Sequence, residues 1–214
     1  MRPIVVTCGP YTAPSATNIR TASSVTSGAV TLNGSLVSSS VATLDTQRRV
    51  LFTSAGNDSG ITFTITGTNA SNDVISETLT GGNTTSVYTV LSYKTVTAVT
   101  ASGASAGNVS IGTNGVADST WVRLDDWALP NVSIQSVVSG TINYTIQQTY
   151  DDVNSPAGTI TASSVTWSTL VAAAAATAIT NAAYQPVFVR VLINSNTNPA
   201  TVTTTFLQTG VVPQ

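Results

Sequence analysis

The chain has 214 residues, a formal net charge of −2 and a charged fraction of only 7%, while 42% of its residues are hydrophobic. This composition excludes an intrinsically disordered chain, which combines low hydrophobicity with high charge. The basic residues are dispersed, so the sequence offers no basic stripe to neutralise a nucleic-acid backbone. No apolar run reaches the ~18 residues of a membrane span, and the N-terminus lacks the pattern of a secretory signal. We therefore expect a protein made in a cytoplasm, with no nucleic-acid or membrane partner.

Alternation of apolar and polar residues recurs along the chain and predicts half-buried antiparallel strands. The first plausible strands lie at residues 3–7 and 29–32, with a Ser/Thr-rich connection between them. Clearer alternation follows at residues 61–66, 132–134, 142–146 and 188–193. Gly- and Asn-rich turns separate these runs. Short strands with closely spaced turns predict β sandwiches.

The second half of the sequence resembles the first, which indicates a duplicated domain. Phe63, between two isoleucines, corresponds to Tyr144, and Val50 precedes the first strand as Val132 precedes the second. Farther along, Leu79 corresponds to Leu170 and Tyr93 to Tyr184, with equal spacing in both halves. The second copy carries extra residues around 159–167 and 196–199. The alanine-rich residues 172–183 correspond to residues 81–92, so we expect a loop or strand there and not a full helix.

The sequence thus predicts an all-β fold of two similar antiparallel β-sandwich domains in tandem. The N-terminal domain spans residues 1–117 and includes an arm, residues 1–43, that the repeat leaves over; the C-terminal domain spans residues 118–214. The arm has three open roles: it completes the first sandwich, it supplies an ordinary first strand to its own domain, or it reaches a neighbouring copy and adds a strand there. Its first strand is the candidate intersubunit interface, formed by Pro3, Ile4, Val5, Val6 and Thr7.

Residues that support catalysis or metal binding are scarce. Histidine is absent, which removes the usual general base and imidazole ligand. The aspartates and the single glutamate are expected to be solvated turn residues, since neighbours on a strand point to opposite faces and cannot form a glycosidase pair. Residues 151–154 have part of the acidic pattern of a calcium loop but lack its glycine and distant glutamate. We predict no catalytic residues, no metal, no cofactor and no small-molecule substrate.

The lone cysteine and the tryptophans are expected to be core residues. Because Cys8 is the only cysteine of the sequence, an internal disulfide is excluded, and Cys8 is expected to be a packed free thiol. Trp121, Trp127 and Trp167 are expected to fill a domain core, with an aromatic sugar-binding platform as the alternative.

Several segments resemble a block found in virion proteins of tailed bacteriophages. Residues 53–68, with the sequence TSAGNDSGITFTITGT, and residues 106–113, AGNVSIGT, are the longest of them. Residues 31–34, 42–45, 48–50, 76–78 and 94–96 continue the resemblance, and residues 121–125, 138–144 and 189–192 are similar to a companion segment of the same proteins. The resemblance implies a structural protein without catalytic residues, located in a virion that is assembled in the cytoplasm of a bacterial host. Its partners would be the major capsid protein or the neck or tail proteins of the particle.

Three functions follow as hypotheses. The first is a virion structural protein that decorates or cements the capsid. The second is a neck, tail or fibre-anchoring virion protein, and the third, of another class, is a carbohydrate-binding or adhesin module based on the tryptophans. We expect a homo-oligomer or an ordered array within the particle, because sandwiches leave edge strands that this chain has few charges to protect.

Overall fold

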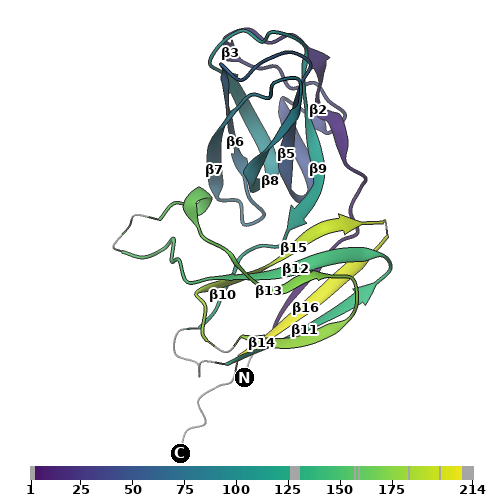
Figure 1. The fold of residues 1–214 in the computed structure, drawn as a ribbon, viewed down its shortest axis with the longest axis vertical. Coiled ribbons are helices and arrows are strands. Elements are labelled where there is room, and N and C mark those ends of the chain that lie inside the picture. Colours follow the sequence, from purple (N-terminus) through teal and green to yellow (C-terminus); the bar gives the residue numbers. More distant parts are fainter. Residues whose placement is uncertain are drawn as a thin grey trace, which may run out of the picture. The chain divides into compact units, whose positions relative to one another are not determined.

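The structure, a computed structural model, describes residues 3–125, 131–156, 158, 160–182, 184–197 and 199–208. These residues form an all-β protein with one short 3-10 helix and no α-helix (Figure 1), as the alternation predicts. Within the alanine-rich stretch, residues 172–174 and 178–182 belong to two strands, so the described part of the stretch is not a helix, as expected. Within the part of the chain that the structure describes, no helix is long and apolar enough to cross a membrane.

The chain divides into two compact units, which we call the N-terminal unit (Thr12–Ala117) and the C-terminal unit (Met1–Tyr11 with Asp118–Gln214). The N-terminal unit contains β2 (Ser15–Ser23), β3 (Gly28–Ala29), β4 (Val37–Ser38), β5 (Val41–Ser54), β6 (Thr62–Thr68), β7 (Val74–Thr80), β8 (Ser86–Ala101) and β9 (Val109–Asp118), the last of which ends on the first residue of the other unit. The C-terminal unit contains β1 (Pro3–Cys8), β10 (Val122–Arg123), β11 (Val132–Ser139), β12 (Ile142–Thr149), the 3-10 helix η1 (Ala162–Ser164), β13 (Ser168–Ala174), β14 (Ala178–Ala182), β15 (Phe188–Asn196) and β16 (Thr201–Gln208).

Two long strands, β5 and β8, build both layers of the N-terminal unit. The end of β5 pairs with the start of β8 and with β9, whereas the end of β8 pairs with β6, which in turn pairs with β7. Register shifts interrupt the β5–β8 ladder, and such irregularities let a strand bend from one layer into the other. Phe52 on β5 and Phe63 on β6 are fully buried, and their ring centroids lie 5.1 Å apart. Because β5 and β6 are not paired with each other, these rings meet across the core.

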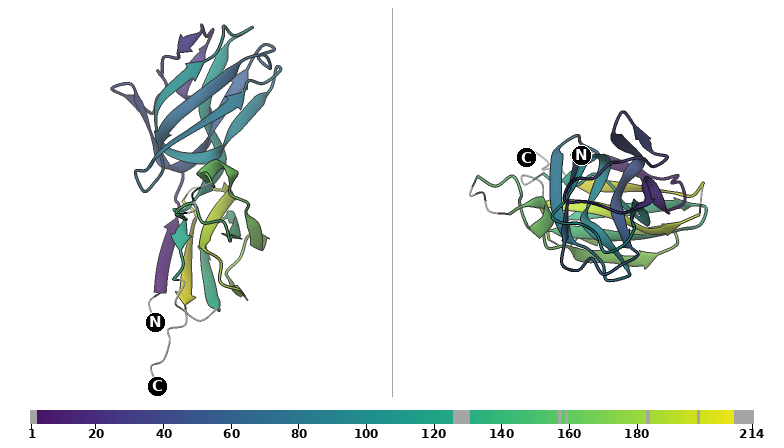
Figure 2. Two further views of the ribbon diagram at one scale, coloured as in Figure 1. Left: turned by 90° about the vertical axis from the view of Figure 1, so that its left-hand side faces the viewer. Right: turned by 90° about the horizontal axis from the view of Figure 1, so that it is seen from above.

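The C-terminal unit is a sandwich of two separate sheets. One has the strand order β1-β16-β11-β14, and the other contains β13, β12 and β15 with the short β10 beside β15. Burial alternates along β11 and β16, where Ile134 and Phe206 are buried and face the second sheet. Tyr144 and Ile193 are a buried pair on β12 and β15. Figures 1 and 2 show the two layers.

The strand pairings of the two units correspond, as the internal repeat predicts. In the N-terminal unit β5 pairs with the start of β8 and with β9, and in the C-terminal unit β11 pairs with β14 and with β16. Likewise β6 pairs with β7 and the end of β8, as β12 pairs with β13 and β15. The outermost strands correspond too, since β2 pairs with β9 and β1 with β16. The extra residues expected around 159–167 lie between β12 and β13 and include η1.

Individual residue matches in the repeat are partly right. Phe63 and Tyr144 lie in equivalent strands and are both fully buried, as predicted. The match of Tyr93 with Tyr184 is wrong: Tyr93 is buried within β8, whereas Tyr184 lies between β14 and β15 with 74% of its surface exposed. The physical reason is that β8 crosses between the layers as one continuous strand, while the C-terminal unit makes the same crossing with an irregular connection.

The leucine match is wrong as well. Leu79 pairs with Phe63 across β6 and β7, but the residue opposite Tyr144 is Ala174 and not Leu170. Register shifts in the β12–β13 ladder displace the second copy relative to the first. The sequence spacing missed this displacement because a bulge changes the register without a recognisable sequence signal.

The assignment of residues 1–43 to the N-terminal domain is wrong for the first strand. β1 pairs with β16 over six residues, and residues up to Tyr11 belong to the C-terminal unit. Residues 12–43 stay with the N-terminal unit, where the expected strand at residues 29–32 is reduced to the two-residue β3. The N-terminal unit is therefore inserted in the chain between the first strand of the C-terminal unit and the rest of that unit.

We predict that Phe63→Ala destabilises the N-terminal unit by about 3 to 5 kcal/mol, because it leaves a cavity against Phe52 in a close-packed core. Thermal unfolding followed by circular dichroism measures the effect. Tyr88→Ala serves as the control, since that ring on β8 is 55% exposed and its loss creates no cavity. A Phe63→Ala melting temperature within a degree or two of the parent would contradict the described core.

We also predict that a fragment of residues 118–214 is less stable than the same fragment followed by a flexible linker and residues 3–11. Pro3 lies opposite Leu207, so a short linker after the end of β16 lets β1 return as a hairpin strand. The side chains of Ile4, Val6 and Cys8 on the returned strand pack against the core of the C-terminal unit, which should raise its free energy of unfolding by at least about 2 kcal/mol. Chemical denaturation measures the difference. Equal stability of the two fragments would show that β1 is dispensable to this unit.

Candidate functional site

The predicted interface residues form β1, the edge strand of the four-stranded sheet. Val5 is 57% exposed, Ile4 and Val6 are half-buried, and Cys8 is buried. Figure 2 shows β1, in purple, along the outside of the sheet, and its register with the yellow β16 has no break. The structure thus places these residues in an ordinary strand of their own chain. Their predicted role between subunits stays a prediction.

Cys8 is a packed free thiol, as expected. Burial raises the pKa of this thiol to about 11; the charge of Asp118 raises it further, and a hydrogen bond with Tyr11 opposes the increase. Since the thiolate is the reactive form, Cys8 is unsuited to nucleophilic or redox chemistry at neutral pH.

Two of the three tryptophans form an aromatic cluster with Phe188. The rings of Trp121 and Trp167 meet edge to face, with centroids 5.0 Å apart, and Trp121 lies 6.0 Å from Phe188 in a similar arrangement. Arg190 covers the Trp167 ring at 4.0 Å from its centroid. An edge-to-face pair with an arginine on one ring does not present the flat, coplanar surface that stacks against a sugar. Trp127 lies outside the described residues.

Arg190 also joins a buried ion pair. Its guanidinium donates to Asp118 at 3.1 Å and to the side-chain oxygen of Gln147 at 2.9 Å, and both charged residues are almost fully buried. Removing one partner from such a pair leaves an uncompensated charge in the interior. The aromatic cluster and the ion pair therefore connect β12, β15 and the start of the C-terminal unit internally.

In the candidate calcium segment, residues 151–154, the carboxylates of Asp151 and Asp152 make hydrogen bonds and an ion pair within the fold. Asp152 pairs with Arg123 at 3.1 Å and accepts a hydrogen bond from the backbone of Asn154. Asp151 accepts a bond from the backbone N–H of Thr166 at 2.6 Å. Among the described residues, no group of three or more acidic, cysteine or histidine side chains is placed to hold a metal ion.

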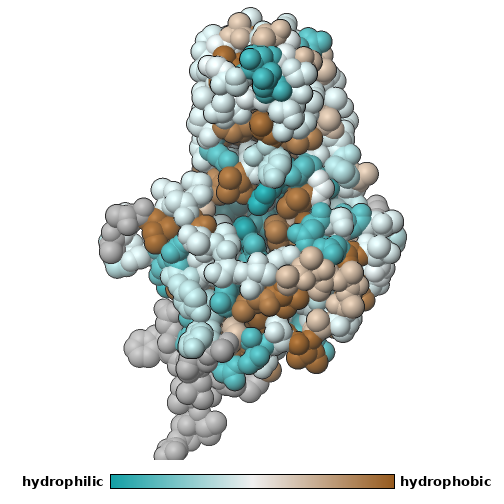
Figure 3. Space-filling view, in the orientation of Figure 1, coloured by the Kyte–Doolittle hydropathy of each residue, from teal (hydrophilic) through white to brown (hydrophobic). Residues whose placement is uncertain are grey.

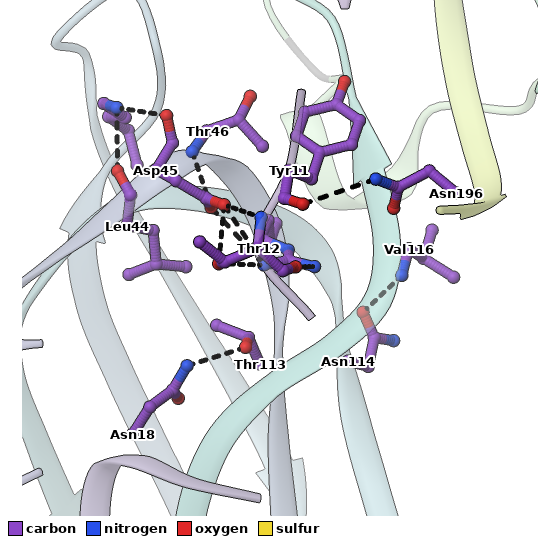
Figure 4. A network of polar contacts seen from close by, with 12 residues as sticks. Tyr11, Thr12, Asn18, Leu44, Asp45, Thr46, Thr113, Asn114, Val116 and Asn196 are labelled. Atoms are coloured by element: carbon purple, nitrogen blue, oxygen red, sulfur yellow. Dashed lines mark hydrogen bonds and ion pairs between the residues drawn. The ribbon is translucent and has the colours of Figure 1, made fainter. Parts of the chain in front are cut away.

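A second charged network lies in the N-terminal unit around Thr12 and Asp45 (Figure 4). It includes Arg48, whose side chain is only 1% exposed. Its guanidinium donates to the backbone carbonyl of Thr12 at 3.0 Å and lies 3.4 Å from the Asp45 carboxylate. Asp45 in turn accepts bonds from the N–H and hydroxyl of Thr12 and from the N–H of Thr46. Lys94 binds the carbonyl oxygens of Leu44 and Asp45. The network fastens the start of the unit to β5 and β8.

Burial alone would raise the pKa of Asp45, but the hydrogen bonds from Thr12 and the charge of Arg48 outweigh it and hold the pKa below its usual value. The carboxylate is therefore ionised in the folded protein at neutral pH. The hydrogen bonds of the Asp45 carboxylate stabilise the fold at pH values above the pKa that Asp45 has in the unfolded chain. This stabilisation is lost as the pH falls through the pKa that Asp45 has in the folded protein.

Asp58 organises the loops at one end of the N-terminal unit. Its backbone N–H donates to Gly82, its carbonyl accepts from Ile61, and one carboxylate oxygen accepts from the N–H of Ala106 at 2.7 Å. The other carboxylate oxygen is buried and makes no hydrogen bond. Gly81 packs against this residue so closely that a Cβ there would lie 2.5 Å from the Asp58 carbonyl oxygen. One side chain thus connects three loops.

The expectation that the carboxylates are solvated turn residues is wrong for Asp58 and Asp118, which are buried. Sequence reasoning also missed that three of the basic residues, Arg20, Arg48 and Arg190, are buried. Arg20 uses its guanidinium to bind the carbonyl oxygens of Ser23, Ser24 and Val109, and burial lowers its pKa. A signal was present at Arg190, which sits inside an uninterrupted β-branched and apolar run.

The outer surface is correspondingly poor in charge. On the face shown in Figure 3, hydrophilic and near-neutral residues predominate, with hydrophobic residues in small groups among them. Several cross-strand hydroxyl pairs line the strands, for example Thr64 with Thr78 at 2.8 Å and Thr53 with Ser86 at 2.8 Å. Such pairs stabilise neighbouring strands without charge.

We predict that Asp45→Asn lowers the free energy of unfolding of the N-terminal unit at pH 7 by about 1.5 to 3 kcal/mol, the range for hydrogen bonds to charged groups. Because the folded-state pKa of Asp45 is lowered, the difference between variant and parent should shrink as the pH falls below about 4. Denaturant unfolding at several pH values measures both effects. Asp73→Asn, at an exposed carboxylate of the same unit, is the control. A difference that does not change with pH would contradict the assigned role of the Asp45 charge.

A scan against models of protein families found no match to this chain, and searches of curated proteins and of solved structures found none either.

Proposed function

We propose that this chain is a non-enzymatic structural protein of a tailed-bacteriophage virion, where it decorates or cements the capsid. The observation that carries the proposal is the resemblance of residues 53–68 and 106–113 to a block of such virion proteins, taken with their place in the fold. Residues 53–68 contain the end of β5, the Asp58 turn and β6, and residues 106–113 contain the start of β9. Asp58 joins the two segments through its bond to Ala106. The resemblance thus covers the framework of a sandwich.

The placement of charge supports a packing role. Buried ion pairs and arginines hold each unit together internally, while the strands carry hydroxyl and amide side chains on their outer surfaces. A surface of this kind can lie against another protein without the cost of burying unpaired charges. Two similar sandwiches in one chain also provide two rigid surfaces for contacts within a particle.

A neck, tail or fibre-anchoring protein is the second position within the virion. The same resemblance supports it, because the resembling block is not confined to capsid proteins. The two positions differ in location, since decoration covers the capsid surface and a neck or tail protein lies at or beyond the portal vertex.

We predict that an affinity-tagged copy of the chain, expressed in host cells that produce the particles, copurifies with complete virions. Labelling followed by electron microscopy should place it over the capsid surface. Particles made without the chain should release their genome at a lower temperature than particles that contain it. The Phe63→Ala variant carries the same tag on a weakened fold, so it is the control for association that the tag alone causes. Label confined to the neck or tail would support the second position, and failure to copurify with any particle would reject the virion role.

A further inference from the structure

The edge strands of the two units differ in how well they are protected against pairing with another chain. An exposed strand edge presents unpaired N–H and C=O groups, and proteins protect it with charges, bulges or very short strands. In the N-terminal unit the edge strand β7 has Glu77 at its centre, and β2 pairs with β9 through two register shifts. In the C-terminal unit β13 pairs with β12 through register shifts. These strands carry the usual protection.

β1 has neither a charge nor a bulge, and its one proline, Pro3, lies at its first position. Its six residues, PIVVTC, contain no charge, and its register with β16 is unbroken. Among the described residues β16 is its one strand partner, and no described strand pairs with its other side. Ile4, Val5 and Val6 are β-branched and favour an extended strand. The other edge of the same sheet, β14, is a residue shorter and contains two alanines and Asn181, which favour strands less.

We infer that β1 is a self-pairing edge, through which two copies of this chain join by two-fold antiparallel β1–β1 pairing into one continuous sheet. In a two-fold antiparallel pair the central residue of one strand faces the same residue of the other copy. Every other residue faces the one that lies equally far from the centre on the opposite side. A charge at the centre would therefore face a like charge, which disfavours self-pairing. Centred on Val5, the pairing sets Val5 against Val5 and Ile4 against Val6. The same operation on β7 would set Glu77 against Glu77.

The surroundings of β1 fit a second copy as the occupant. None of the residues in β1, β16, β11 and β14 is charged, so the four strands of one copy bring no like charges toward those of the other. Val5, Val137 and Ile179 are exposed apolar residues on the outer face of this sheet. The inference does not depend on the proposed function and concerns the purified chain alone.

Sedimentation velocity of the full chain over a concentration series tests the inference. The parent should show a reversible dimer, and Val5→Lys should weaken it about tenfold or more, because two lysines then face each other across the axis. Ile179→Lys is the matched control: it adds the same charge at a 76% exposed position on the same face, at the opposite edge of the sheet. This variant should dimerise like the parent, and thermal melting should show both variants folded.

A cysteine pair gives an independent measurement that does not rely on disrupting the strand. Directly opposed residues of an antiparallel pair have Cα atoms about 4.5 to 5.5 Å apart, within the range a disulfide needs. Val5→Cys should therefore form a covalent dimer on mild oxidation, whereas Ile179→Cys should not, and the buried Cys8 is a poor competitor.

Three results would overturn the inference. The first is a parent that is monomeric at every concentration. The second is a Val5→Lys variant that dimerises like the parent. The third is equal loss of the dimer in Val5→Lys and Ile179→Lys, which would indicate contact through the sheet face or pairing of β1 with β14.

Discussion

The pairing of β1 with β16 is the constraint on which the rest of the structure depends. It brings the beginning of the chain into the same sheet as its end, over six uninterrupted residue pairs. Because β2 to β9 belong to the N-terminal unit, the whole of that unit lies in sequence between β1 and the remainder of the C-terminal unit. The chain therefore passes twice between the units. The C-terminal sheet is complete only when residues from both ends of the sequence have come together, which gives it contacts of long sequence separation.

Three of the few basic residues of this protein are used for internal support. The guanidinium groups of Arg48 and Arg190 each contact a carboxylate and donate to a neutral oxygen acceptor. The guanidinium of Arg20 donates to backbone carbonyl oxygens. Each of these groups would be costly to bury alone, and the bonds they accept or donate offset that cost. The surface of the described residues carries few charges and many hydroxyl and amide groups. A chain with this distribution suits extensive contact with other proteins better than steering of charged ligands, which needs a concentrated surface charge.

The two units show how a duplicated sandwich diverges. The pattern of paired strands is the same in both, and the buried aromatic at the centre is Phe63 in one and Tyr144 in the other. The copies differ where the chain crosses between layers. β8 makes the crossing as a single bent strand, while the C-terminal unit divides it between β14 and β15. The extra residues of the second copy lie elsewhere, between β12 and β13, because connections between strands tolerate insertions better than paired strands do.

The sequence by itself determined the all-β class, the two sandwiches, the boundary after residue 117 and the burial of Phe63, Tyr144 and Cys8. These properties follow from local signals, because the two-residue period of a strand and the turn residues between strands are written in neighbouring positions. Only the tertiary structure decided that β1 belongs to the C-terminal unit, that Asp58 and Asp118 are buried, and that Tyr184 is exposed while Tyr93 is not. An uncharged strand such as Pro3–Cys8 fits the edge of either sandwich equally well by pattern. Its partner is chosen by contacts between residues nearly the whole chain length apart, and no local pattern of one sequence records them.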